Sequence, residues 1–337
     1  MGTIADQSVL VAGGSRGLGL LLARQCVERR CEVTVTARDQ EELDYAVGLL
    51  RRRARPHGTA VTGQVCDVRD EAAVREVTAR TAERQGGLDV VLANAGIIQV
   101  GPAEAAGTAG FRDAMETMFF GALHTSMAAL PYLRESPGGG RLALTGSVGG
   151  LLPVPHLLPY SCAKSAVAAL AEGLRAEQGG GGVSVTAVHP GLMRTGSHIQ
   201  AEFAGDEGQE YAWFATLAGL PLLSMDARRA AERIVTAVER RRTRVVLTPA
   251  AHLGAKAYGV APALVTRVNG AVARLMPDTR PSGRQGRSRW QYAVSALNDR
   301  ASRRLNQTDR TGRTDRTDRT AGTAAGSDSS NSSRSDT

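Results

Sequence analysis

A serine, a tyrosine and a lysine have the spacing of a proton-transfer group. Tyr160 and Lys164 lie four residues apart, which on a helix places them on one face, one turn from each other. An isolated phenol, with a pKa of about 10, is a poor acid–base catalyst at neutral pH. A lysine ammonium one turn away stabilises the phenolate and lowers that pKa. Ser147 stands thirteen residues before the tyrosine, and the three side chains together form the candidate catalytic group.

A glycine-rich stretch near the N-terminus, GGSRGLG at residues 13–19, predicts a phosphate-binding turn. The strand-like run Ser8–Ala12 precedes it, and a helical pattern follows over Gly17–Arg30. Glycines let the backbone approach a pyrophosphate, and a helix N-terminus offers free N–H donors and the positive end of its dipole. We interpret the stretch as a dinucleotide-binding turn, the alternative being a tight turn with no ligand.

Two arginines favour NADP over NAD as the dinucleotide. The second strand-like run ends at Arg38, and no carboxylate precedes Asp39 at the place where one would hydrogen-bond both ribose hydroxyls of NAD. Arg38 and Arg16 could instead clamp a 2′-phosphate through charge and bidentate hydrogen bonds. The alternative interpretation is a pair of solvated surface arginines.

Strand-like and helix-like segments alternate over the first 250 residues. This pattern predicts an α/β fold, a Rossmann-type doubly wound parallel sheet of about seven strands with helices on both faces. We expect strands at 8–12, 32–36, 59–66, 88–93, 141–145, 183–188 and 244–247, and helices at 17–30, 39–54, 70–85, 109–133, 158–178 and 226–241.

The chain is expected to be one catalytic domain, residues 6–250, followed by a C-terminal extension. Residues 251–277 are apolar. Residues 278–306 are basic, and their stretch 288–306 has the apolar spacing of an amphipathic helix, which would lie on an anionic membrane surface or dock on its own domain or a partner subunit. We favour docking. Residues 307–337, with Thr-Asp-Arg repeats, are expected to be disordered.

Composition excludes several classes of protein. No apolar run reaches about 18 residues and no secretory signal is present, so we expect a cytoplasmic protein without a membrane span. Much of the net charge of +8 falls after residue 277, where twelve Arg face seven Asp, so no nucleic-acid partner is expected. The four cysteines lack metal-binding spacing and are expected to be reduced, with no metal site and with Cys162 as a packing residue.

These motifs together resemble the short-chain dehydrogenase/reductase family, classical type, over about residues 6–250. Ser147, Tyr160 and Lys164 match its catalytic serine, tyrosine and lysine. The positions that match its cofactor-binding motifs are Gly13, Ser15, Arg16, Gly17, Leu18 and Gly19 in the glycine-rich turn, Asp67 and Val68 at the adenine, Asn94, Ala95 and Gly96 in the N-A-G turn, Pro190 and Gly191 in the P-G turn, and Thr195 at the nicotinamide carboxamide.

The resemblance implies hydride transfer between a nicotinamide and a carbonyl or secondary alcohol carbon of a small molecule. Tyr160 would be the acid or base, and Ser147 would orient the substrate oxygen. Lys164 would lower the pKa of Tyr160 and bind the nicotinamide ribose. The family also implies a homodimer or homotetramer.

One position departs from the family's pattern. Met118, in the sequence MFFGA, stands where the family has an asparagine that holds a water connected to the lysine. A thioether is only a weak acceptor. Either backbone groups hold the water instead, or the protein is slow or catalytically impaired and serves as an NADP(H)-binding sensor.

An apolar segment after Pro190–Gly191 predicts the kind of substrate. Four aromatic residues lie within twelve positions in what is a substrate lid in the family, namely Phe203, Tyr211, Trp213 and Phe214. We expect a bulky apolar ketone or alcohol. The alternative is that these side chains pack the lid on the core or form a subunit interface. His156 is expected near the substrate without a catalytic role, and His189 is expected to be structural.

Overall fold

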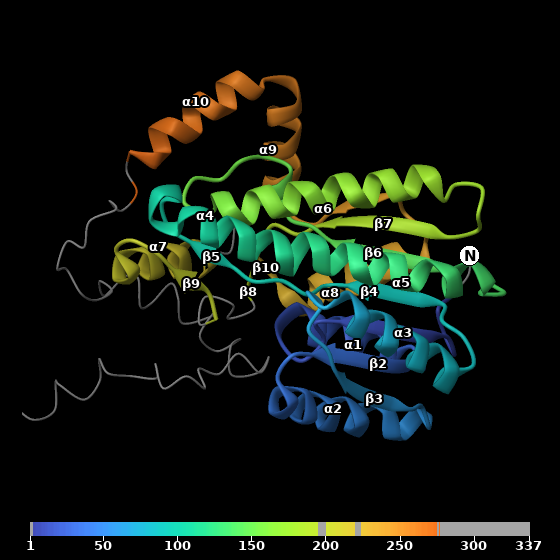
Figure 1. The fold of residues 1–337 in the computed structure, drawn as a ribbon. Coiled ribbons are helices and arrows are strands. Elements are labelled where there is room, and N and C mark those ends of the chain that lie inside the picture. Colours follow the sequence, from blue (N-terminus) through green and yellow to red (C-terminus); the bar gives the residue numbers. More distant parts are fainter. Residues whose placement is uncertain (1–2, 195–199, 220–223, 275, 277–337) are drawn as a thin grey trace, which may run out of the picture.

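The computed structural model describes residues 3–194, 200–219, 224–274 and 276. The expected amphipathic helix at 288–306, the tail at 307–337 and Thr195 lie outside the described residues. The core is a seven-stranded parallel sheet in the order β11-β7-β6-β4-β1-β2-β3 (Figure 1), as predicted. Its strands are β1 (Ser8–Ala12), β2 (Glu32–Ala37), β3 (Val61–Val65), β4 (Val90–Ala93), β6 (Arg141–Thr145), β7 (Ser184–His189) and β11 (Arg244–Val246).

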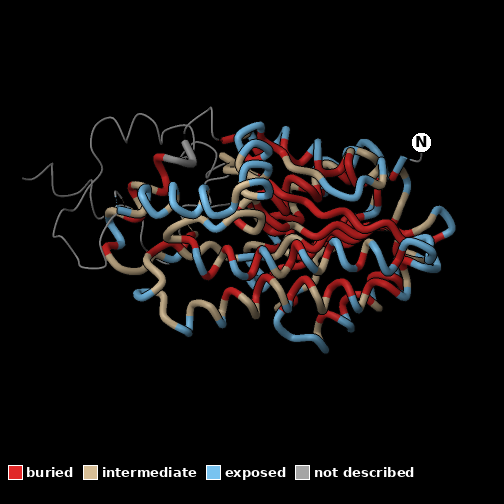
Figure 2. Tube along the Cα trace, turned by 90° about the horizontal axis from the view of Figure 1, so that it is seen from above, coloured by how far each residue is buried: buried red, intermediate tan, exposed pale blue. Residues whose placement is uncertain are grey.

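The central strands are buried along their whole length because helices cover both faces of the sheet (Figure 2). Val9 and Val11 pack with α1, α2 and α8 on one face, whereas Leu10 and Ala12 pack with α3, α5 and α6 on the other. These helices are α1 (Gly17–Glu28), α2 (Gln40–Ala54), α3 (Glu71–Gln85), α5 (Gly121–Glu135), α6 (Leu158–Glu177) and α8 (Ala227–Glu239).

Side chains mark where two of the helices begin. Asp39 accepts a hydrogen bond from the backbone N–H of Glu42 at the start of α2, and Asp70 accepts one from Ala73 at the start of α3. Such caps satisfy N–H groups that have no partner inside the helix. The expected helices at 39–54 and 70–85 therefore each begin one residue later, with the aspartate as the cap.

The single helix expected at 109–133 is wrong in detail. The structure has α4 (Ala103–Ala114), then a π-helical stretch η2 (Met115–Phe120), then α5. Inside α4, Gly107 has the non-helical angles φ 57° and ψ 179°. A π-helix makes i→i+5 hydrogen bonds and is often found at functional sites, but apolar periodicity does not reveal it. Met118 lies within this stretch.

The strand order reverses beside β1, which places a crevice at the carboxyl ends of β1 and β4. Ala12 pairs with Ala93, and Ala93 pairs with Leu144 on β6. The glycine-rich turn, the N-A-G turn and the segment carrying Ser147 therefore leave the sheet side by side.

Smaller elements gather beyond the carboxyl end of the sheet (Figure 1). They are the paired strands β5 (Gln99–Val100) and β9 (Glu202–Phe203), the paired strands β8 (Leu192–Arg194) and β10 (Ser224–Asp226), and the helix α7 (Glu207–Gly219). The chain then forms α9 (Pro249–Val260) and α10 (Pro262–Ala273). Within the described residues, no helix is long and apolar enough to span a membrane.

Candidate active site

The three candidate catalytic residues meet beyond the end of β6. Ser147 begins the short 3₁₀ turn η3 (Val148–Gly150), where its Oγ accepts a hydrogen bond of 3.1 Å from the Gly149 N–H. Tyr160 lies in the first turn of α6, and Lys164 lies one turn later. Tyr160 and Ser147 both border Gly149, where a Cβ would lie 3.4 Å from Cε1 of the tyrosine and 3.6 Å from Oγ of the serine.

Lys164 is buried and has a fixed partner. Its Nζ donates a hydrogen bond of 2.7 Å to the carbonyl oxygen of Thr145 and lies 5.8 Å from the centroid of the Tyr160 ring. Burial lowers the pKa of Lys164 to about 8. The ammonium form still predominates at neutral pH, and the proton is easier to lose than from an exposed lysine.

Tyr160 stands between two apolar clusters. One contains Leu157 and Phe214, and the other contains Met118 and Ala163. Burial raises the pKa of Tyr160, and the nearby Ser147 hydroxyl lowers it in part. That Lys164 lowers this pKa stays a prediction.

Met118 is 1% exposed and packs with Ala114, Ala163 and Tyr160. An apolar side chain thus occupies the position of the family's asparagine. The neighbouring Thr117 hydroxyl is buried and has no hydrogen-bond partner among the described residues. Buried polar groups without a protein partner commonly bind water. Sequence reasoning did not single out Thr117, because a threonine in an apolar helical segment carries no signal of such a role.

The N-A-G turn holds the glycine-rich turn in place. The Asn94 side chain donates a hydrogen bond of 3.2 Å to the carbonyl of Gly13. Gly13 has φ +75°, and a Cβ there would lie 2.7 Å from the Cα of Ala95. A Cβ on Gly19 would collide with the carbonyl oxygen of Gly13. Only glycine fits these two positions.

The first turn of α1 is open to an anion. Arg16 precedes the helix and makes no side-chain cap to it, so the N–H groups of Gly17, Leu18 and Gly19 have no helical acceptor. Gly96 is exposed and lies beside Lys164, since a Cβ there would be 3.5 Å from Nζ. Without a side chain at Gly96, the space in front of the lysine stays open. Bare backbone donors and glycine-lined space fit the pyrophosphate and ribose of a dinucleotide.

The two arginines predicted at the cofactor differ in their surroundings. Arg16 donates hydrogen bonds of 3.0 Å to Glu42 and 2.8 Å to Gln200, and Ser15 also bonds Glu42 at 3.2 Å. Arg38 is exposed and makes no hydrogen bond or ion pair with any described residue. Sequence reasoning missed Glu42, because a glutamate in the first turn of a helix is ordinary there.

Asp67 and Val68 are also held by neighbours. Burial raises the pKa of the Asp67 carboxyl, but hydrogen bonds from Arg69 lower it, and the net pKa lies below the usual range. An Arg69 guanidinium nitrogen lies 2.6 Å from Oδ2 of Asp67. The Val68 carbonyl lies 3.0 Å from Nδ1 of His124 on α5. Both residues are therefore held in place shortly after the end of β3.

The P-G turn closes the crevice on the side of Ser147. The Pro190 carbonyl accepts a hydrogen bond of 2.8 Å from the Val148 N–H. A Cβ on Gly191 would lie 2.5 Å from the hydroxyl of Thr248, so a larger residue would have to displace the side chain that caps α9. His189 is fully buried in β7, and burial lowers its pKa to about 4, which keeps the ring neutral.

A second histidine forms a buried pair that the sequence did not predict. His156 Nδ1 lies 2.5 Å from Oε1 of Glu210, which is 0% exposed on α7. Burial and the nearby Asp206 raise the pKa of Glu210 to about 8, and burial lowers that of His156. His156 has φ +59°, a strained backbone held by its surroundings. The pair fastens α7 to the loop that precedes Tyr160.

Another sequence expectation is wrong. Cys162, between Tyr160 and Lys164, is exposed on α6 rather than packed. Its neighbours turn inward because a helix places successive side chains about a quarter-turn or more apart.

Within the described part of the chain, no group of three or more His, Cys, Asp or Glu side chains could hold a metal ion.

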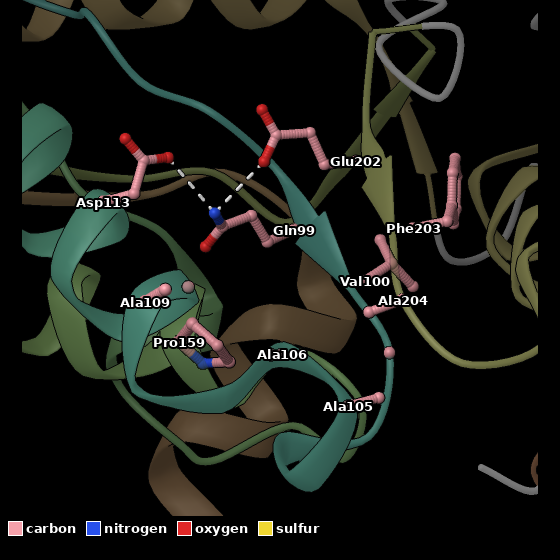
Figure 3. A pocket seen from close by; sticks show the side chains of 12 residues that line it. Gln99, Val100, Ala105, Ala106, Ala109, Asp113, Pro159, Glu202, Phe203 and Ala204 are labelled. Carbon is pink, nitrogen blue, oxygen red and sulfur yellow. Dashed lines mark hydrogen bonds between the residues drawn. The ribbon is translucent and has the colours of Figure 1, made fainter.

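A largely apolar pocket of about 330 Å³ lies beside this centre (Figure 3). Its wall includes Val100, Ala106, Phe203 and Pro159, the last immediately before Tyr160. At one end the Gln99 amide donates to Asp113 at 3.2 Å and to Glu202 at 3.1 Å. The catalytic side chains do not line it, but Val100 and Phe203 also belong to the cluster that contacts Tyr160.

Solved structures share the architecture. A short-chain dehydrogenase from Streptomyces avermitilis aligns with a TM-score of 0.64 and 28% identity, covering 79% of this chain and 98% of that one. A short-chain dehydrogenase from Burkholderia cenocepacia, solved in complex with NADP, aligns with a TM-score of 0.63 and 24% identity, covering 74% and 99%, and supports the fold alone.

Sequence comparisons agree. An 11-beta-hydroxysteroid dehydrogenase from Pinus massoniana is 32% identical over 206 residues, which are 60% of this chain and 55% of that protein. Sulfoacetaldehyde reductase 2 from Chromohalobacter salexigens is 32% identical over 188 residues, 56% and 73% of the two chains. The family described as short chain dehydrogenase matches residues 7–203, more than half of this chain. The chain therefore belongs to the short-chain dehydrogenase/reductase family.

Proposed function

We propose that the protein is an NADP(H)-dependent oxidoreductase that interconverts a carbonyl and a secondary alcohol. The observation that carries this is that Tyr160 and Ser147 meet at Gly149, with buried Lys164 one helical turn from the tyrosine and beside Gly96 of the N-A-G turn. A hydroxyl pair facing one substrate oxygen can both orient it and exchange a proton with it.

Chain groups suited to hold the dinucleotide surround the crevice. The bare N–H groups at the start of α1 would bind the pyrophosphate, and Arg38 the 2′-phosphate. Asp67 and Val68 would contact the adenine, and Lys164 the nicotinamide ribose. Asn94, Ala95, Gly96, Pro190, Gly191 and Thr195 would line the remaining path. When bound, the nicotinamide supplies or accepts a hydride, which is the chemistry that no side chain can provide.

The proton moves through Tyr160. In the reducing direction its hydroxyl donates to the oxygen as negative charge develops there, and in the oxidising direction the phenolate accepts the proton. Ser147 fixes the oxygen by a hydrogen bond. The charged Lys164, held by the Thr145 carbonyl, stabilises the phenolate that donation leaves behind.

The surroundings of Tyr160 favour a bulky apolar substrate. Tyr160 and Trp213 both pack against the apolar cluster that contains Leu157 and Phe214, and the pocket behind Pro159 could take the distal part of a large molecule. The relatives' names span a steroid and a small sulfonated aldehyde, so they do not choose between sizes.

Substrate size can be tested directly. With NADPH, we expect turnover of multi-ring and long-chain ketones to exceed that of acetaldehyde. Ala106→Phe fills the pocket and should lower kcat/KM for the bulky ketones at least about tenfold, the size of effect that pocket contacts produce. Thr108→Phe, exposed on the same helix and outside the pocket wall, is the control. Equal rates for all sizes, unchanged by Ala106→Phe, would count against the proposal.

The packing of Met118 favours a second candidate, a catalytically impaired NADP(H)-binding sensor. This candidate predicts NADPH binding by fluorescence with no turnover of any carbonyl. Measurable turnover by the unmodified protein eliminates it. In either case we propose a cytoplasmic homodimer or homotetramer, by resemblance to the family.

A further inference from the structure

The two C-terminal helices carry an unusual amount of exposed apolar surface. We call α9 and α10, Pro249–Ala273, the C-terminal arm. The arm stands off one end of the domain (Figure 1), and none of the α10 residues is buried. Five of the ten large apolar side chains that are exposed in the described part of the chain belong to it, namely Leu253 (71%), Val260 (87%), Leu264 (61%), Val268 (53%) and Val272 (46%).

The arm has an inner and an outer face. The Asn269 side chain donates a hydrogen bond of 2.7 Å to the Pro153 carbonyl, which fastens α10 to the loop before α6. Leu264, Val268 and Val272 are four residues apart and form one stripe on a different face. Among the described residues, the contact with the domain thus leaves the apolar stripe uncovered.

Positive charge accompanies the stripe. The arm and the residue after it contain Lys256, Arg267 and Arg274 but no Asp or Glu. Residues 249–306 contain ten Lys and Arg against two Asp, a net charge of +8, which equals the net charge of the whole chain. The rest of the protein is therefore neutral on balance, and its basic character is concentrated in one continuous segment.

We propose that the C-terminal arm docks on the surface of an anionic lipid membrane. An apolar helical stripe beside lysine and arginine side chains suits an interfacial position, with the stripe among acyl chains and the cations at the headgroups. Docking of the arm against itself in a second copy would bring like charges together. A nucleic acid would match the cations but leave the stripe exposed. The inference goes beyond the proposed function and does not depend on it.

Vesicle flotation of the full chain tests the proposal. We expect binding to phosphatidylcholine vesicles containing about 30% phosphatidylserine, and at least about tenfold weaker binding to pure phosphatidylcholine. Raising the salt from about 50 to about 500 mM should weaken the binding to anionic vesicles, because screening shortens the range of charge attraction.

Two double variants test whether the C-terminal arm is the surface that binds the vesicles. Leu264→Asp with Val268→Asp should weaken binding to anionic vesicles at least about tenfold, while Tyr45→Asp with Val65→Asp, two exposed apolar residues elsewhere, should not. A melting curve like that of the unmodified protein shows that the arm variant is folded. Unmodified protein that does not float, or an arm variant that floats equally well, overturns the proposal. An arm variant that converts an oligomer to a monomer in sedimentation assigns the surface to a second copy instead and also overturns it.

Discussion

Arg38 is expected to set the preference for NADPH over NADH. It is exposed and unpaired among the described residues, whereas Arg16 is already bonded to Glu42 and Gln200. A hydrogen bond to a charged group contributes about 1.5–3 kcal/mol, and solvent screening at an exposed side chain keeps the value toward the lower end. Arg38→Ala should thus weaken the binding of NADPH by about 1–2 kcal/mol, which is about 5- to 30-fold in Kd, and change the Kd of NADH by less than about twofold.

A second variant tests the same cofactor preference, because Glu42 would compete with the 2′-phosphate of NADPH for Arg16. Glu42→Gln removes the opposing charge, keeps the shape of the side chain and should strengthen NADPH relative to NADH. The matched control for Arg38→Ala is Arg24→Ala, which removes an arginine that is paired with Glu28 on α1. The assay is kcat/KM for each cofactor at one saturating ketone concentration, supported by cofactor Kd from fluorescence.

Two outcomes would refute the reasoning. One is an unmodified protein that prefers NADH. The other is an Arg38→Ala variant with the same NADPH to NADH ratio as Arg24→Ala, which would mean that Arg38 does not reach the 2′-phosphate.

Three further predictions concern the buried positions. Met118→Asn should lower the free energy of unfolding by about 2–3 kcal/mol, because an amide replaces an apolar side chain, and should change kcat less than about threefold since Lys164 is already held by Thr145. Turnover that appears in Met118→Asn when the unmodified protein has none would instead support the impaired sensor. Glu210, with its pKa raised to about 8, binds a proton in the folded protein that the unfolded chain releases, so its own contribution to stability should fall by about 1.5 kcal/mol as pH rises from about 6.5 to 8. Glu210→Gln should flatten that dependence in melting curves, and parallel slopes would contradict the assignment. Gly19→Ala should abolish NADPH binding or destabilise the fold by about 1–3 kcal/mol, whereas Gly173→Ala, with open space around it, should do neither.

The sheet and the main motifs could be predicted from the sequence because their signals are local. The SVLVA run of β1 is apolar throughout, as a parallel strand buried on both faces must be. The glycine-rich turn follows it directly, and the four-residue spacing of Tyr160 and Lys164 needs only a helix to bring them together.

Contacts between distant segments could not be predicted in this way. Glu210 lies 54 residues after His156, and Glu42 lies 26 residues after Arg16, so neither pairing has a local pattern. Glutamate is usually a surface residue on a helix, which hid the burial of Glu210. The π-helical stretch around Met118 keeps the composition of an ordinary helix, so sequence alone predicted one continuous segment.

The most direct test of the central claim is single-turnover hydride transfer by Tyr160→Phe. The substitution keeps the ring that packs between the two apolar clusters and removes only the hydroxyl. General acid–base catalysis contributes about 10²–10⁴ in rate, so NADPH oxidation by an accepted ketone should slow by at least about 10²-fold while the NADPH Kd stays unchanged. A Tyr160→Phe rate within about threefold of the unmodified protein would contradict the claim that Tyr160 transfers the proton.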